Sequence, residues 1–317
     1  MGYKGFIQSS IMQKGQPATA DSLMLEGFIA PLTATVIERL EAAGMQIAGR
    51  IGTSEFGVDK TGDGSLSYFA NGEADFVLCN DYTGVISRAA ALQGLYYIHP
   101  TYGSVSRYGL IPSVSSMDQI GVLFKSFDVG FQVLKIIAGY DSKDGVMVED
   151  KSQIINHKSQ IREGKFETEY SKIFPQIMQI LCCAELSNNI SRYDGIKFGY
   201  RAKGYGSLRE LYTKSRTEAF GEDVKLAALI GAMVLSQENY MRYYDKAMRL
   251  RRLIKDSLEF DKYDVIETEC PLLSRLCGLP SLSTPEKVYI ADAGREDVLE
   301  AIGKDIDDSE RAVGETL

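Results

Sequence analysis

Residues Asp75–Leu92, which read DFVLCNDYTGVISRAAAL, decide the fold of this chain. Asp75–Cys79 is a short apolar run, typical of a buried strand. A loop containing a glycine follows it, and Thr83–Leu92 then predicts a helix. Strand, tight loop and helix is an arrangement that presents a nucleophile and backbone N–H donors in α/β enzymes. The stretch therefore indicates an α/β fold.

The rest of the chain shows further strand and helix patterns. Ala34–Gly44 is amphipathic and predicts a helix that ends at the glycine. The longest predicted helix is Glu222–Leu258, with a bend near Gly231; for its methionine and tyrosine side chains we expect core packing rather than contact with a partner. The other predicted elements are the strands Met45–Ile51 and Lys287–Ala291 and the helices Asp128–Gly139, Ile173–Leu186 and Arg295–Ile302.

Composition narrows the classes of partner. The net charge of −8 makes nucleic acid an unlikely partner, because binding to phosphates needs a basic face. Five cysteines without a CxxC pair predict a reducing, cytoplasmic setting, and no apolar run is long enough to span a membrane. Asp59–Ala70 fits part of a calcium loop, but Ala70 stands where a bidentate glutamate is needed, so we expect no metal and no cofactor.

Several blocks of sequence resemble one enzyme family. They are TYGSVSRYGLIPSVSSMDQIG at Thr101–Gly121, SNNISRYDGIKFGYR at Ser187–Arg201, SRTEAFG at Ser215–Gly221 and VKLAALIG at Val224–Gly231. They are similar to the amidase-signature family and, within it, to the A subunits of glutamyl-tRNA(Gln)/aspartyl-tRNA(Asn) amidotransferases. The resemblance implies a mixed β-sheet core with helices on both faces. It also implies one domain over residues 1–317, trimmed relative to the family, with a flexible or remodelled segment near 140–165.

The positions of the family's catalytic triad hold other residues. The family uses a serine nucleophile, a second serine in a cis peptide and a lysine base. The family loop G-S-D-T-G-G-S-I-R aligns with CNDYTGVIS at Cys79–Ser87, which places Val85 at the nucleophile. Thr61 falls at the bridging serine and Gln8 at the lysine. Valine has no nucleophilic atom and a neutral amide cannot accept the proton, so the resemblance implies no catalytic residue.

The loop and the substrate pocket are altered as well. Asp81, Tyr82, Thr83 and Gly84 form a vestigial oxyanion loop by the same alignment. Leu226 and Ala227 stand where the family's tRNA amidotransferases place a carboxylate-binding arginine, and Gln179 stands at a family tyrosine.

Three functions remain open. The first is an inactive amidase-like scaffold that binds a protein partner or forms a homo-oligomer, because trimming exposes core surface. The second is an active hydrolase of carbon–nitrogen bonds, such as the glutamine amide. Its nucleophile would be Thr61, Ser65, Ser87 or Cys79, with Lys4 or Lys60 as base. The third is a noncatalytic subunit of a tRNA amidotransferase-like complex. No small-molecule ligand follows from the sequence.

Overall fold

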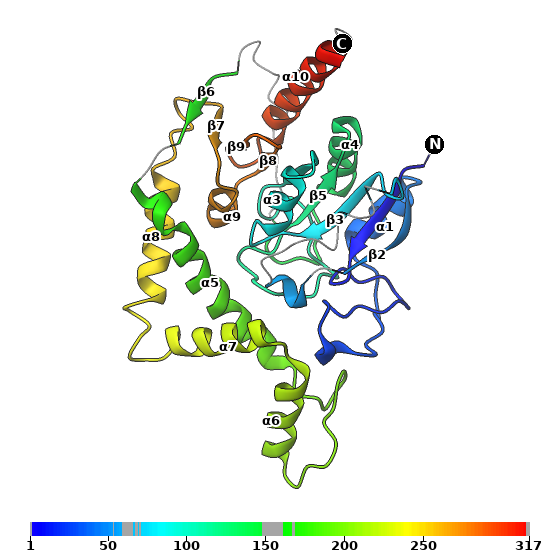
Figure 1. Ribbon diagram of the computed structural model, residues 1–317, viewed down its shortest axis with the longest axis vertical. Coiled ribbons are helices and arrows are strands. Elements are labelled where there is room, and N and C mark those ends of the chain that lie inside the picture. The colour runs from blue at the N-terminus through cyan, green and yellow to red at the C-terminus, as the bar shows by residue number, and fades with distance from the viewer. Residues whose placement is uncertain are drawn as a thin grey trace.

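The computed structural model describes residues 2–52, 54–58, 66, 69, 71–147, 161–166 and 169–314. Within these ranges the chain is a mixed α/β protein, as the sequence predicted (Figure 1). Its strands are β1 Lys4–Gln8, β2 Gln46–Ile51, β3 Phe76–Asn80, β4 Tyr96–His99, β5 Ile120–Phe124, β6 Glu163–Lys165, β7 Val265–Thr268, β8 Ser281–Ser283 and β9 Val288–Ala291. Its α-helices are α1 Thr35–Ala42, α3 Val85–Ala91, α4 Phe127–Ile137, α5 Phe174–Asn189, α6 Leu208–Ala219, α7 Glu222–Val234, α8 Tyr244–Asp256, α9 Leu272–Cys277 and α10 Glu296–Gly314.

The described strands form one sheet, in the order β2-β1-β3-β5-β4-β8-β9-β7-β6. β1 runs parallel to both β2 and β3, and β6 runs parallel to β7. The other pairs are antiparallel. The parallel pairing of β1 with β3 brings the carboxyl ends of these two strands to the same edge of the sheet, which matters for the site below.

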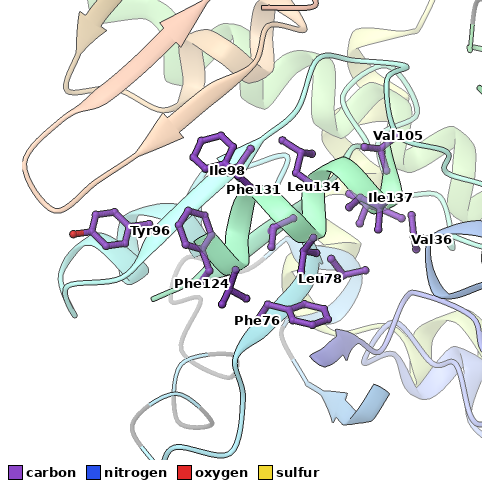
Figure 2. Packing of buried hydrophobic residues seen from close by; sticks show 14 of the residues in the cluster. Val36, Phe76, Leu78, Tyr96, Ile98, Val105, Phe124, Phe131, Leu134 and Ile137 are labelled. Carbon is purple, nitrogen blue, oxygen red and sulfur yellow. The ribbon is translucent and has the colours of Figure 1, made fainter. Parts of the chain in front are cut away.

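Successive side chains of a strand point to opposite faces of the sheet, so each strand contributes to the apolar core on both faces. In β3, Phe76 and Leu78 belong to one apolar cluster, and Val77 and Cys79 belong to another. This is the expected result for a strand with side chains that point alternately to opposite faces. The first cluster packs under α1, α4 and α10; Figure 2 shows its side chains around α4, with Phe124 and Phe131 close together. The buried strand predicted from DFVLC is therefore confirmed.

The opposite face of the sheet is covered by α3, α5, α8 and α9. Ile86 and Ala90 of α3 pack on the second cluster. A third cluster joins the apolar sides of α5, α8 and α9 to Val288 and Ile290 of β9. α7 packs on α5 so closely that a Cβ added at Gly231 would come within 2.2 Å of the Cys183 carbonyl oxygen. Helices on both faces confirm the fold class implied by the family resemblance.

The prediction of one long helix over Glu222–Leu258 was wrong. α7 ends at Val234 and α8 begins at Tyr244. Between them, the Ser236 hydroxyl donates to the Met233 carbonyl oxygen at 2.7 Å, and Asn239 Nδ2 donates to Ser236 Oγ at 3.0 Å. Serine and asparagine side chains that bond nearby groups compete with the helical hydrogen bonds, which explains the break.

The segment near 140–165 is folded at both of its described ends. Asp141 is buried and accepts hydrogen bonds from Thr35 Oγ1 at 2.6 Å and from Ser106 Oγ at 2.7 Å. At the other end, Glu163–Lys165 is β6, paired with β7. Buried hydrogen bonds and strand pairing therefore hold these two ends. The flexible or remodelled segment expected near 140–165 stays a prediction, because residues 148–160 lie outside the described residues. The single-domain boundary at 1–317 stays a prediction.

Within the described ranges, no helix is both long enough and apolar enough to cross a bilayer.

Candidate functional site

The loop between β3 and α3 is held in shape by its glycine. Gly84 precedes the first residue of α3 and has a φ of 69°, a left-handed conformation that glycine adopts without strain. It also allows close packing, since a Cβ added there would lie 3.1 Å from Pro271 Cγ. Pro271 and α9 thus sit directly against the loop at which the family resemblance places the reaction.

Gln8, at the predicted lysine position, makes a structural contact. It is the last residue of β1 and is only 3% exposed. Its Oε1 accepts a hydrogen bond from the backbone N–H of Asn80 at 2.7 Å. Asn80 is the last residue of β3, so this hydrogen bond joins the carboxyl end of β1 to the start of the loop. The Gln8 amide satisfies a buried backbone donor.

Asn80 extends this contact into a buried polar chain. Asn80 Nδ2 donates to Asp118 Oδ1 at 2.8 Å, and Asp118 also accepts from the backbone N–H groups of Ser113 and Val114. Burial raises the pKa of Asp118, and these hydrogen bonds act in the opposite direction. The carboxyl end of β3 is therefore joined to the segment before β5.

Val85, at the predicted nucleophile position, begins α3 and is 9% exposed. Its side chain is aliphatic, so this position offers no atom that can attack a carbonyl. Thr61, the residue predicted at the bridging position, lies outside the described residues, as do Lys60, Ser65 and most of the possible calcium loop.

Asp81 stabilises the start of α3. Its Oδ1 accepts from the Ile86 N–H and its Oδ2 from the Ser87 N–H, both at 3.0 Å. Two of the helix's first backbone donors are thereby satisfied by a carboxylate. These two N–H groups are consequently engaged within the protein.

Asp81 also forms a buried ion pair with Arg275 of α9, which the sequence analysis missed. Arg275 Nη2 lies 3.0 Å from Asp81 Oδ2, and both side chains have no exposed surface. Arg275 Nε donates to the Asp81 carbonyl oxygen at 3.2 Å. A buried charge is tolerated only when it is paired and hydrogen-bonded, and here both conditions are met.

Three serine hydroxyls and an aromatic ring complete the surroundings of this guanidinium. Nη2 donates to Ser87 Oγ at 3.1 Å, and Nη1 donates to Ser274 Oγ at 2.8 Å and to Ser281 Oγ at 3.1 Å. The guanidinium carbon stands 5.4 Å from the centre of the Tyr97 ring. We call Asp81, Ser87, Ser274, Arg275 and Ser281 the Arg275 cluster. Ser87 stands where the family loop has its arginine, so in this chain a guanidinium reaches the loop from α9.

A signal for Arg275 was present in the sequence. It is the single charge in the run PLLSRLCGLP at Pro271–Pro280, which is otherwise apolar or uncharged. A lone cation in a segment of this kind indicates a buried partner of opposite charge. What the sequence could not supply is which of the 43 acidic residues that partner is, because Asp81 and Arg275 are 194 residues apart.

Cys79 and Tyr82, on either side of the loop's first residues, both belong to the core. Burial raises the pKa of the Cys79 thiol well above its ordinary value, and the Asp81 charge acts in the same direction. Thiolate formation is thus suppressed. The Tyr82 hydroxyl donates to the Phe56 carbonyl oxygen at 2.8 Å, and its ring packs with α5 and α9. Thr83, also in the predicted oxyanion loop, is half-buried.

The three residues predicted for an altered substrate pocket lie in different surroundings. Gln179 is exposed on α5, and Leu226 is 54% exposed on α7. Ala227 is buried in a cluster with Tyr193 and Phe220. Leu226 therefore cannot fill a cavity, because more than half of its side chain faces solvent.

Comparisons with known proteins identify relatives over most of the chain. The amidase family model matches residues 63–166 and 146–270. The A subunit of the glutamyl-tRNA(Gln) amidotransferase of Lachnoclostridium phytofermentans is 33% identical, over 90% of this chain and 70% of that protein. The corresponding protein from Wolinella succinogenes is 35% identical, over 90% of this chain and 77% of that protein.

Solved structures show the same fold. A protein from a vestigial complex related to an s-triazine catabolic enzyme has a TM-score of 0.76 at 16% identity, over 97% of this chain and 84% of that one. The A subunit of the glutamyl-tRNA(Gln) amidotransferase of Thermotoga maritima has a TM-score of 0.61 at 24% identity, over 92% of this chain and 79% of that one. Together with the family model and the curated relatives, this likeness shows that the chain belongs to the amidase-signature family and is related to the A subunits of the tRNA amidotransferases.

Proposed function

We propose that this protein is a catalytically inactive amidase scaffold that acts by binding another protein chain. The observation that carries the proposal is the chemistry of two side chains, those at the positions predicted for the base and for the nucleophile. Gln8 offers a neutral amide that is already bonded to Asn80, and Val85 offers a hydrocarbon. A hydroxyl nucleophile needs both an oxygen and a base, and neither position supplies one.

Among the substitutes considered for an active enzyme, the three that the structure describes, Cys79, Ser87 and Lys4, are poorly suited to the task. The raised pKa of Cys79 disfavours the thiolate. The Ser87 hydroxyl is buried, donates to the Gly84 carbonyl oxygen at 3.2 Å and accepts from Arg275. Lys4 is exposed at the opposite end of β1, four residues and therefore about 13 Å from Gln8 along the strand. The Arg275 guanidinium that contacts Ser87 has only donors and cannot accept the hydroxyl proton, so it cannot serve as the general base.

The binding role is supported by an apolar strip on α7. Leu226, Leu229 and Met233 are exposed and share one face of the helix, and Leu229 is 70% exposed. The core packing expected for the methionines of this region is therefore wrong for Met233. The other face, with Val224, packs in the interior. Contiguous exposed apolar side chains mark interaction surfaces. The relatives are named as one subunit of an amidotransferase, which favours a different protein chain over a second copy of this one.

The loss of chemistry is tested with purified protein. We expect no ammonia release from glutamine, asparagine or propionamide, and no adduct by intact mass after treatment with a fluorophosphonate. Turnover that disappears in Thr61→Ala, Ser87→Ala or Cys79→Ala would identify a working nucleophile and overturn the proposal.

The binding role is tested through the strip. We expect the isolated chain to be monomeric by light scattering. We also expect it to form a stoichiometric complex, reconstituted from purified components, with a partner identified by cross-linking in the source cells. Leu229→Lys should abolish this complex, whereas Leu92→Lys, at an exposed leucine at the end of α3, should leave it intact. A stable homodimer that Leu229→Lys dissolves would assign the strip to a second copy instead.

A further inference from the structure

A separate hollow lies beside α3. Its volume is about 380 Å³, within the range of about 300–1,000 Å³ that small-molecule sites occupy. Ser87 and Ala91 of α3 form one side, Ser283 and Pro285 form another, and Pro271 contributes a third wall. The hollow thus runs between α3 and the turn from β8 to β9.

In the wall of this hollow, Ser283 carries a buried hydroxyl that makes no hydrogen bond within the described residues. Leu282 belongs to the apolar cluster under α4, so Ser281 and Ser283 point to the opposite face of the sheet, on which α3 lies. Ser281 Oγ is bonded within the Arg275 cluster. Ser283 is 3% exposed, and its Oγ has no hydrogen-bond partner among the described residues. A buried hydroxyl in this state is unfavourable until a partner supplies the missing bond.

We propose that this hollow binds a small, uncharged molecule with an apolar body and one polar group that hydrogen-bonds to Ser283. The bound group is neutral because the charged side chains of the wall are either exposed, as are Arg88, Glu269 and Glu286, or, in the case of Lys287, already paired with Glu267. Ser283 offers only a hydroxyl, and the charges of Asp81 and Arg275 are already paired with each other. A carboxylate or ammonium group would lose its hydration there without a counter-ion.

The remaining wall residues fit the body of such a ligand. Ala91, Pro271 and Pro285 give apolar contacts. Charged side chains of both signs, among them Arg88 and Glu269, also line the hollow, but these two reach solvent and therefore stay hydrated. Ligands are held in such sites by apolar surface and oriented by a few polar groups.

The hollow adjoins the loop at which the family resemblance places the reaction, because Ser87 belongs both to its wall and to the Arg275 cluster, but the Ser283 hydroxyl lies outside that cluster. Ser281 reaches the guanidinium of Arg275, and Ser283 lies two residues, about 7 Å, further along β8. The proposal therefore does not depend on whether the protein hydrolyses amides.

Four ring compounds of similar size test the ligand class, namely benzamide, benzyl alcohol, benzoate and benzylamine. Binding is measured by saturation-transfer difference NMR with the full chain. We expect the two neutral compounds to bind in the millimolar range and the two charged ones to bind at least tenfold more weakly. Equal binding of benzoate or benzylamine, or no binding by either neutral compound, overturns the proposal.

Three variants locate the binding. Ser283→Ala should weaken benzamide roughly fivefold, the worth of one neutral hydrogen bond, and should not destabilise the free protein. Ser10→Ala is the matched control, because Ser10 Oγ is also buried without a partner among the described residues and is not part of the hollow. Ala91→Phe fills the hollow and should abolish binding. If the Ser283 and Ser10 variants lose affinity equally, or if Ala91→Phe still binds benzamide, the site is wrongly assigned.

Discussion

Two groups of residues lie around the loop between β3 and α3, and their side chains have different roles. One is the Arg275 cluster, and the other is the pair Gln8 and Val85. The cluster joins Asp81 to Arg275 and to three serine hydroxyls, with no exposed surface on the two charged side chains. Gln8 and Val85, which the family alignment predicts at the positions of the base and the nucleophile, are buried and carry neither group. The comparison teaches that an ion pair and hydrogen bonds beside the positions aligned with the family's triad maintain the shape of this loop. The contribution of these interactions to stability can therefore be measured separately from any activity.

The largest expected effect comes from opening the cluster. Arg275→Met keeps most of the side-chain volume but leaves Asp81 buried without its counter-ion. We expect the free energy of unfolding to fall by about 3–5 kcal/mol, measured by urea denaturation. Arg252→Met is the control, because Arg252 pairs with Asp256 on the exposed side of α8 and should change little.

A double variant sharpens this result. Asp81→Asn combined with Arg275→Met should cost less than the sum of the two single changes, because the double variant no longer buries an unpaired charge. Additive losses would mean that the two side chains do not act as a pair.

Gln8 should show the second largest effect. Gln8→Leu removes the acceptor of the Asn80 N–H, a buried backbone donor, and we expect a loss of about 1–3 kcal/mol in unfolding free energy. Gln13→Leu changes a glutamine whose bond to Glu41 is exposed, and it should have little effect. If both variants are equally stable, Gln8 has no structural role and the comparison above fails.

Glycine substitutions test how tightly α9 packs on the loop. Gly84 and Gly94 have φ angles of 69° and 70°, so alanine carries the same backbone strain at both positions. At Gly94 a Cβ would meet no atom within 4 Å, whereas at Gly84 it would lie 3.1 Å from Pro271 Cγ. Thermal denaturation should therefore show a loss of about 1 kcal/mol for Gly94→Ala and about 2 kcal/mol for Gly84→Ala. A larger loss at Gly94 would contradict the packing of Pro271 on the loop.

Local sequence patterns predicted the parts of this fold that depend on local chemistry. The apolar run at Asp75–Cys79 became β3, and the amphipathic Ala34–Gly44 became α1, with a shift of one or two residues at each end. The break between α7 and α8 was missed because it comes from side-chain bonds of Ser236 and Asn239 rather than from periodicity.

The site was predicted less completely, for a physical reason. The alignment predicted Gln8 at the family's lysine position, and this role stays a prediction; its hydrogen bond to Asn80 shows only that Gln8 lies beside the loop. The Arg275 cluster depends on the contact of α9 with α3 and β8. Neither the alternation of apolar and polar residues nor the spacing of residues along the chain predicts this contact. The roles proposed for Val85 and Thr61 stay predictions until activity is measured.

The last effect vanishes at neutral pH and concerns His99, which flanks the cluster on β4 opposite Ser281. Burial lowers the pKa of His99 well below its ordinary value of 6.5, and the positive charge of Arg275 adds to this. The folded protein therefore keeps the imidazole neutral at a pH at which the unfolded chain already binds a proton. Since proton uptake by the unfolded state favours unfolding, this stability is complete above about pH 6.5 and is lost as the pH falls below it.

The measurement is the difference in unfolding free energy between the protein and His99→Gln from pH 7.5 to pH 5. Carboxyl groups with raised pKa values, such as Asp118 and Glu55, act in both proteins and cancel in the difference. We expect this difference to be constant above pH 7. Below that pH, the protein with His99 should lose unfolding free energy relative to His99→Gln by up to about 1.4 kcal/mol per pH unit. A flat difference across the whole range would mean that His99 takes up a proton in the folded state as readily as in the unfolded one. The Arg275 cluster would then be less isolated from water than its burial indicates.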